Sequence, residues 1–193
     1  GVKIEPADVH ETLGKYMLVD GYPIVLDLDK SEGSWVFDSL NSKKYLDFFT
    51  FYASAPLGCN HPKVRTKDFM KKLGRVAVNK PTSSDSYTEE MAEFVEVFSK
   101  YCMKKDFEHL FFFFVGTLGV ENALKAAFDW KVRKNFAKGK TEELGQQVIH
   151  FEKAFHGRSG YTLSLTNTFD PRKTQYFPKF NWPRIPEPTI TFP

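Results

Sequence analysis

The stretch from residue 110 to residue 135 constrains the fold more than any other part of this chain. Leu110–Val115 is an uninterrupted apolar run that predicts a buried strand, and Gly116-Thr117 ends it. Residues 118–135 are rich in Ala, Leu, Lys and Glu, which predicts a long helix. The free N–H groups and dipole of such a helix favour a phosphate at the turn before it. The alternative is that Gly116 only makes a turn between two buried elements.

A second apolar segment follows the predicted helix. Gln147–Phe151 is expected to form another buried strand, which completes a strand-helix-strand unit with parallel pairing and a right-handed crossover. Ligands of such sheets bind beyond the carboxyl ends of the strands. We therefore expect the turn at Gly116 and the segment after Phe151 to lie at one edge of the sheet.

The segment after Phe151 places three chemically useful side chains on one glycine-flanked turn. Arg158 could bind a carboxylate through two parallel hydrogen bonds, and Phe155 could stack on a flat ring. The alternatives are a surface salt bridge for Arg158, core packing for Phe155 and a structural hydrogen bond for His156.

The rest of the chain is expected to be mixed helix and strand. Polar turns separate three short strands that favour a small antiparallel sheet, and an aromatic loop, residues 49–58, either lines a pocket or packs under that sheet. The expected helices are 7–16, 69–78 and 88–101, the last with an apolar stripe in the core; the expected strands are 24–28, 34–38 and 44–48. A polar loop covers 79–86, residues 161–166 favour strand by propensity although a helix is also allowed, and prolines preclude regular structure over most of 168–193.

Composition narrows the class of protein. The net charge of +3 is modest and the charges are interspersed, which argues against nucleic-acid or membrane binding. Cys59 and Cys102 lie far apart without metal-like spacing, so we expect reduced thiols and a cytoplasmic location. No apolar run approaches the ~20 residues of a membrane span, and no signal-peptide pattern is present.

Several motifs together resemble the class III aminotransferases, which use pyridoxal phosphate. The motifs are Gly116-Thr117, residues 121–131, Phe155-His156-Gly157-Arg158, and segments 17–21, 45–51, 79–81, 154–168 and 177–185. The resemblance covers nearly the whole chain and is greatest to the lysine-specific members. It implies an α/β fold of type I, with a mostly parallel sheet covered by helices on both faces. Residues 1–55 would be the N-terminal part of a small α+β domain, and 56–193 the front part of the large cofactor-binding domain.

The resemblance also implies roles for six residues. Backbone groups of Gly116 and Thr117 would hold the cofactor phosphate. Phe155 would stack on the pyridine ring, and His156 would support that turn. Arg158 would bind the substrate α-carboxylate, and Tyr52 would line the substrate side of the pocket. The implied reaction moves the terminal amino group of L-lysine to 2-oxoglutarate in a homodimeric enzyme of lysine metabolism.

The same resemblance predicts that the lysine which binds the cofactor, and the carboxylate that pairs with its pyridine nitrogen, lie beyond these 193 residues. The chain then corresponds to the N-terminal half of an enzyme and is inactive alone. A 4-aminobutyrate or ornithine specificity, or a non-catalytic fragment, are the alternatives. Val115 and Gly116 stand where the lysine-specific members usually have two glycines, and the run Phe111–Phe114 replaces a strand end that is normally more varied and carries an acid. Tyr52 stands where a smaller residue is common, so the substrate stays open.

Overall fold

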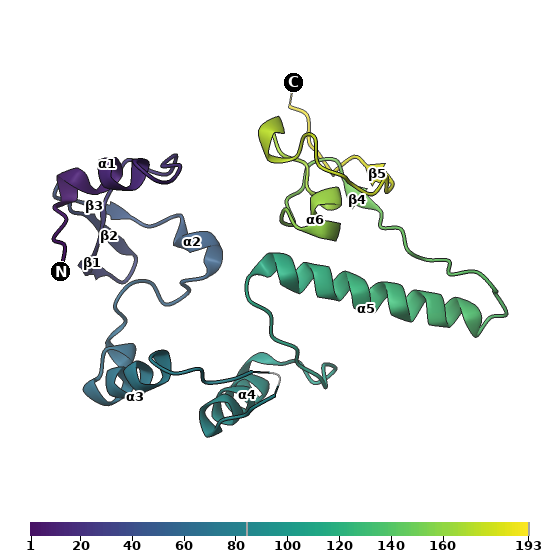
Figure 1. The fold of residues 1–193 in the computed structure, drawn as a ribbon, viewed down its shortest axis with the longest axis horizontal. Helices are drawn as coiled ribbons and strands as arrows, with labels where there is room; N and C mark the ends of the chain where they lie inside the picture. The colour runs from purple at the N-terminus through teal and green to yellow at the C-terminus, as the bar shows by residue number, and fades with distance from the viewer. Residues whose placement is uncertain (84, 193) are drawn as a thin grey trace. The chain divides into compact units, whose positions relative to one another are not determined.

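A computed structural model describes residues 1–83 and 85–192 (Figure 1). The chain divides into two compact units, Gly1–Met103 and Lys104–Pro193, and each is described by itself. The domain boundary that we predict near residue 55 stays a prediction.

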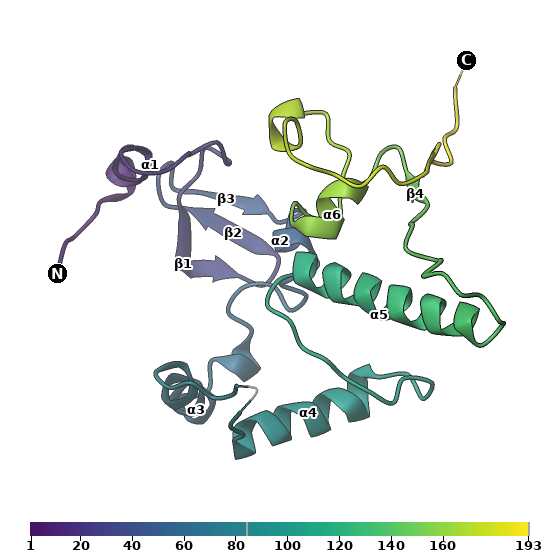
Figure 2. The same cartoon turned by 45° about the vertical axis from the view of Figure 1, so that its right-hand side comes forward.

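The first unit contains the predicted antiparallel sheet. The short helix α1 (Val9–Gly14) follows a 3-10 turn at Pro6–Asp8, close to the expected helix 7–16. The strands are β1 (Leu26–Glu32), β2 (Trp35–Asp38) and β3 (Lys43–Leu46), paired in that order (Figure 2). Leu26 lies opposite Asp38, and Trp35 lies opposite Leu46, so consecutive strands run antiparallel. The predicted meander is confirmed. It could be predicted because the polar turns that separate its strands are local features of the sequence.

Two helices complete the first unit. They are α3 (Lys67–Ala77) and α4 (Glu89–Cys102), with Thr66 and Thr88 as their N-caps. Each threonine hydroxyl accepts a hydrogen bond from a backbone N–H of the first turn, which stabilises the helix start. The apolar stripe of α4 was expected in the core, and that is wrong for this unit: no residue of α4 is fully buried. The loop expected at 79–86 includes residue 84, which lies outside the described residues.

The aromatic loop after β3 contains a left-handed turn, α2 (Thr50–Ala53). Its four residues have φ angles of 48°, 49°, 57° and 62°, a conformation that only glycine adopts without strain. On one side of this turn, the Asp47 carboxylate accepts hydrogen bonds of 2.8 Å from the N–H groups of Phe49 and Thr50. On the other side, Gly33 and Cys59 exchange two backbone hydrogen bonds of 2.8 Å. The turn is therefore fixed at both ends to the sheet or its loops.

Aromatic side chains of this loop line a hollow of about 680 Å³ in the first unit. Phe49 and Phe51 contribute to it together with Tyr22, Tyr45 and Val36. The loop thus both lines a pocket and packs against the sheet, which answers the alternative left open by the sequence.

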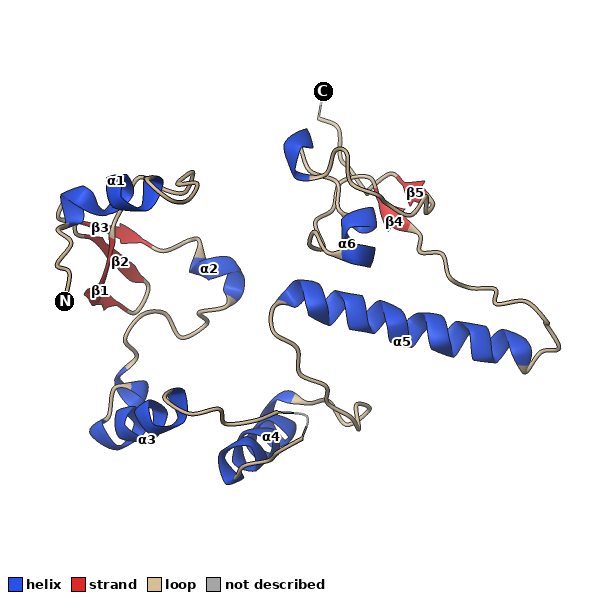
Figure 3. Ribbon diagram, viewed as in Figure 1, coloured by secondary structure: helices blue, strands red, loops and turns tan. Residues whose placement is uncertain are grey.

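The second unit is built around α5 (Gly116–Phe136), which confirms the predicted long helix (Figure 3). The strand predicted at 110–115 is wrong: within the described residues this segment pairs with no strand, and Phe111 and Phe114 are exposed. A strand needs a hydrogen-bonding neighbour, and an apolar run does not provide one. The predicted strand at 147–151 shrinks to β4 (His150–Phe151).

Parallel pairing occurs, but through a different crossover from the one predicted. β4 pairs with β5 (Arg184–Ile185), and α6 (Gly160–Leu165) lies between them in the sequence. Residues 161–166 favoured strand by propensity, yet most of them are helical because Ser159 and Thr162 form a capping box at the helix start. Beyond α6, the chain to residue 192 is largely irregular, as its prolines predict, apart from a 3-10 turn at Pro171–Lys173 and β5.

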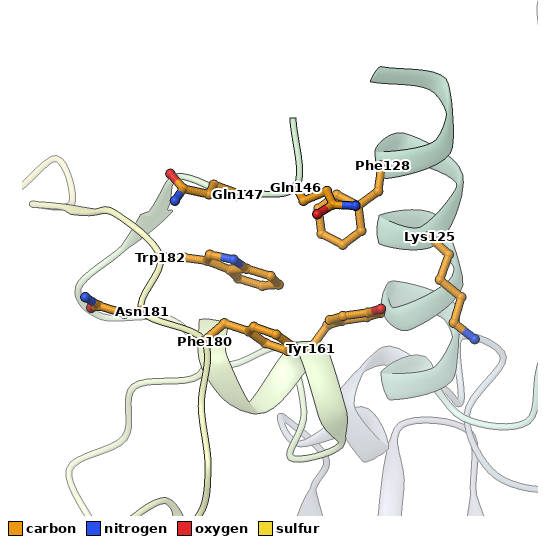
Figure 4. Close-up of a pocket in the computed structure, with 8 residues that line it drawn as sticks. All are labelled: Lys125, Phe128, Gln146, Gln147, Tyr161, Phe180, Asn181 and Trp182. Carbon is orange, nitrogen blue, oxygen red and sulfur yellow. The ribbon is translucent and has the colours of Figure 1, made fainter. Parts of the chain in front are cut away.

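The core of the second unit lies between α6 and the segment before β5. Leu163, Leu165 and Trp182 are buried, and the Trp182 ring stacks on Phe180 at 4.9 Å between centroids. Tyr161 and Phe128 pack on the same cluster, beside a pocket of about 560 Å³ (Figure 4). This aromatic cluster joins α5, α6 and the segment before β5 into one packed unit.

Candidate functional site

The predicted phosphate turn stands at the start of α5. Gly116 and Thr117 are its first two residues, so no earlier carbonyl group of the helix can accept a hydrogen bond from their N–H groups. Val115, just before them, has φ 65° and ψ 152°, a region occupied almost only by glycine. The unusual backbone of Val115 sets the direction in which the chain enters the helix.

The turn after β4 lies directly against this helix start. Gly157 is buried with φ +117°, and a Cβ atom placed on it would stand 2.2 Å from Thr117 Oγ1. Only glycine permits this approach, for reasons of both space and backbone conformation. The structure thus confirms that the turn at Gly116 and the segment after Phe151 come together, although α6 and not α5 connects the parallel strands.

The hydroxyl of Thr166 holds the turn at residues 155–158 through two hydrogen bonds to its backbone. Thr166 is 2% exposed and follows α6 directly. Its Oγ1 accepts a hydrogen bond of 2.9 Å from the His156 N–H and donates one of 2.6 Å to the Gly157 carbonyl oxygen. The backbone N–H of Asn167 adds a bond of 2.7 Å to the Ala154 carbonyl. The turn is therefore fixed to the end of α6.

A buried carboxylate joins α5 to α6. Glu121 is 7% exposed, and its Oε1 accepts hydrogen bonds from Ser159 Oγ at 2.7 Å and from the Thr162 N–H at 3.0 Å. Both donors belong to the start of α6, where free N–H groups favour a negative charge. Sequence reasoning included Glu121 and Thr166 only within longer motifs and gave neither a role, since nothing local predicts contacts over such separations.

The side chains that we predict to bind ligands are exposed to solvent. Phe155 is 63% exposed, and Arg158 has no ion pair with any acid in residues 1–83 and 85–192. His156 is also exposed, and its contact with the turn is the backbone bond to Thr166. Tyr52 belongs to the first unit, where it is 90% exposed on the left-handed turn and does not line the hollow. Five of the six predicted site residues thus share the second unit.

A buried histidine lies on β4, shortly before the turn. His150 is 6% exposed, and neither ring nitrogen has a hydrogen-bond partner among the described residues. Burial, and secondly the nearby Arg184 guanidinium, lower the pKa of the imidazole, so the neutral ring is favoured. This residue contributes to the packing of β4 and faces a penalty on protonation.

The arrangement fits a flat, phosphate-bearing ligand. The helix start offers N–H groups to an anion, the absence of a side chain on Gly157 lets the turn lie directly against Thr117 at that helix start, and Phe155 offers an exposed ring face on the same turn. Over the described ranges, no group of three or more His, Cys, Asp or Glu could hold a metal ion. Among the helices of these described residues, none combines the length and the hydropathy that a membrane-spanning segment requires.

Comparison with known proteins defines the class to which this framework belongs. The model of the class-III aminotransferase family matches residues 16–190, and the chain belongs to that family. The predicted fold is confirmed: the chain forms part of the type I fold of the pyridoxal-phosphate-dependent class III aminotransferases.

The relatives include enzymes named for lysine. An L-lysine-epsilon aminotransferase from Mycobacterium tuberculosis H37Rv is 55% identical over 184 residues, which are 95% of this chain and 41% of the relative. One from Streptomyces clavuligerus is 52% identical over 188 residues, 96% of this chain and 40% of the relative. A solved lysine aminotransferase from M. tuberculosis superposes with a TM-score of 0.90 at 53% identity, covering 97% of this chain and 43% of that chain. The chain spans about two fifths of the length of these curated relatives.

Proposed function

We propose that these residues belong to a pyridoxal-phosphate aminotransferase that moves the ε-amino group of L-lysine to 2-oxoglutarate, giving glutamate and a semialdehyde. The observation that carries this proposal is a gap in identity. Relatives named L-lysine-epsilon aminotransferase are 50–55% identical, whereas a relative from Caenorhabditis elegans named as a probable 4-aminobutyrate aminotransferase is 29% identical.

In this proposal, residues of the second unit bind the cofactor. The N–H groups of Gly116 and Thr117 hold the phosphate at the start of α5, and Phe155 covers one face of the ring, with His156 in the supporting turn. When bound, pyridoxal phosphate supplies an electron sink for the reaction. The residues described here bind and orient it, while the lysine that binds the cofactor and the carboxylate for its ring nitrogen are predicted to lie outside residues 1–193.

Arg158 orients the amino donor in this proposal. It is exposed next to the turn and free of ion pairs within residues 1–83 and 85–192, so its guanidinium can bind the α-carboxylate with two parallel hydrogen bonds. A donor held by its carboxylate presents its distal amine at a distance set by the length of its own chain. The role of Tyr52 on the substrate side of the pocket is implied by the family resemblance alone, and it stays a prediction.

The test uses the complete gene product that carries these residues. Purified enzyme is offered lysine, ornithine or 4-aminobutyrate with 2-oxoglutarate, and glutamate is measured. Lysine is expected to have the highest kcat/KM. Intact mass after borohydride reduction is expected to show a pyridoxyl adduct. A preference for 4-aminobutyrate or ornithine would contradict the lysine specificity, and the absence of any adduct would contradict the enzyme class.

A 4-aminobutyrate or ornithine specificity is the second candidate. It is favoured by 4-aminobutyrate relatives at 24–29% identity and by the Phe155-His156-Gly157-Arg158 turn, which the resemblance shares with such enzymes. We also propose a cytoplasmic homodimer on the strength of the family resemblance. Light scattering of the complete gene product tests the dimer, and cell fractionation tests the location.

A further inference from the structure

The Thr166 hydroxyl makes two contacts to one turn, and the function proposed above assigns it no role. It is 2% exposed, accepts from the His156 N–H at 2.9 Å, and donates to the Gly157 carbonyl at 2.6 Å. A hydroxyl has one hydrogen to donate, and that hydrogen is committed to Gly157. The two contacts therefore fix two peptide groups of the turn, one on each side of the His156–Gly157 peptide, relative to the end of α6.

These peptide groups connect the two halves of the candidate site. His156 follows Phe155, whose ring is the predicted cofactor platform, and Gly157 is the residue that closely approaches Thr117 at the phosphate turn. The turn has no regular secondary structure, so few other bonds hold it. Apart from the Thr166 contacts, the base of the turn is held by a backbone hydrogen bond of 2.7 Å from the Asn167 N–H to the Ala154 carbonyl oxygen.

We propose that Thr166 is a positioning residue for cofactor binding: its hydroxyl fixes the Phe155 platform at the spacing from the Gly116-Thr117 turn that a ring carrying a phosphate needs. This inference rests on the proposed function, because it takes pyridoxal phosphate as the ligand. Thr166 touches neither ring nor phosphate; it acts through the backbone of His156 and Gly157.

The competing explanation is that Thr166 only stabilises the fold, and the chain offers a matched control for it. Ser164 is 1% exposed in the last turn of α6, two residues before Thr166, and its hydroxyl accepts a hydrogen bond of 2.9 Å from the Phe180 N–H. This bond leads to the aromatic cluster and not to the turn. Loss of the Ser164 hydroxyl therefore removes a similar buried bond without disturbing the candidate site.

The experiment compares Thr166→Val, Thr166→Ser and Ser164→Ala in the complete gene product. Thr166→Val preserves the shape and removes the hydroxyl, whereas Thr166→Ser retains it. Dissociation constants of pyridoxal phosphate and of pyridoxal are measured by titration of the apoprotein, visible circular dichroism reports the orientation of the bound ring, and urea unfolding reports stability.

We expect Thr166→Val to weaken binding of both ligands by about tenfold, which corresponds to about 1.4 kcal/mol, and to change the visible circular dichroism. Thr166→Ser should bind as wild type does. Ser164→Ala should lower the urea midpoint without changing either dissociation constant. If the valine variant does not fold, Thr166→Ala makes the same comparison without a second methyl group.

Two results would overturn the inference while the proposed function stands. One is unchanged cofactor binding in folded Thr166→Val or Thr166→Ala protein, and the other is an equal loss of affinity in Ser164→Ala. If wild-type protein binds no pyridoxal phosphate at all, the proposed function fails and this inference fails with it. The two failures are distinguished by the wild-type titration.

Discussion

Replacement of Val115 by glycine is expected to stabilise the protein, although glycine usually destabilises. Val115 has φ 65° and ψ 152°, and its side chain is 56% exposed, so the residue combines an unfavourable backbone with limited burial. A β-branched residue in this region carries strain of about 1–3 kcal/mol. Glycine adopts the conformation freely but loses about 0.5–1 kcal/mol of entropy relative to alanine.

The balance of these terms is a gain of about 1 kcal/mol in the free energy of unfolding. Removal of the partly exposed valine side chain also removes some apolar contact, so we expect the measured gain to be smaller than about 1 kcal/mol. Equilibrium urea unfolding measures it through a higher midpoint at unchanged slope. Glycine at this position should also leave cofactor affinity equal or higher, because the turn widens where the phosphate is expected.

Val115→Ala is the matched control. Alanine keeps the Cβ atom that causes the strain and loses only the two methyl groups, so it should be no more stable than wild type. A Val115→Gly protein that unfolds at the same or a lower urea concentration than Val115→Ala would refute the argument from backbone strain.

Three other substitutions or conditions test the framework. Glu121→Ala should lower the free energy of unfolding by about 1–3 kcal/mol, because Ser159 Oγ and a buried N–H of α6 lose their acceptor, and Glu121→Gln should lose less; urea unfolding distinguishes the two. Gly157→Ala should destabilise by more than about 1 kcal/mol, since φ is +117° and the new Cβ would overlap the Thr117 side chain; an unchanged urea midpoint would contradict the close approach. The lowered pKa of His150, caused by burial and then by Arg184, means that the unfolded chain takes up a proton first as pH falls. Stability should therefore decline below about pH 6.5, and His150→Phe should reduce that decline in unfolding measured across pH; equal slopes in both proteins would contradict it.

Local sequence signals predicted some elements of the fold correctly. The helix at residues 116–136 and the small meander follow from helix-forming residues and polar turns, which act within a few neighbouring positions. The run at 110–115 was misread because strand formation depends on a partner elsewhere, and apolar character alone does not distinguish a strand from an extended segment. At 161–165 the capping box of Ser159 and Thr162 outweighed the strand preference of the side chains.

The candidate site was predictable in outline. Gly116-Thr117 and the turn at 155–158 were expected at one edge, and the contact of Thr117 with Gly157 confirms that they meet. Their roles towards a cofactor stay predictions. Thr166 was missed because its bond to Gly157 spans nine residues and its importance depends on the shape of the turn, which no residue pattern specifies.

The left-handed turn at 50–53 makes the surroundings of Tyr52 a property of the whole first unit. Four non-glycine residues in that conformation at about 1–2 kcal/mol each carry a penalty comparable to the net stability of many domains. A short peptide of this sequence would not maintain the turn, because the compensating bonds come from Asp47 and from the Gly33–Cys59 pair. The left-handed conformation is thus maintained by contacts outside residues 50–53. Any loosening of the sheet would let the turn unwind and would move the Tyr52 ring away from the Phe49 ring that it contacts.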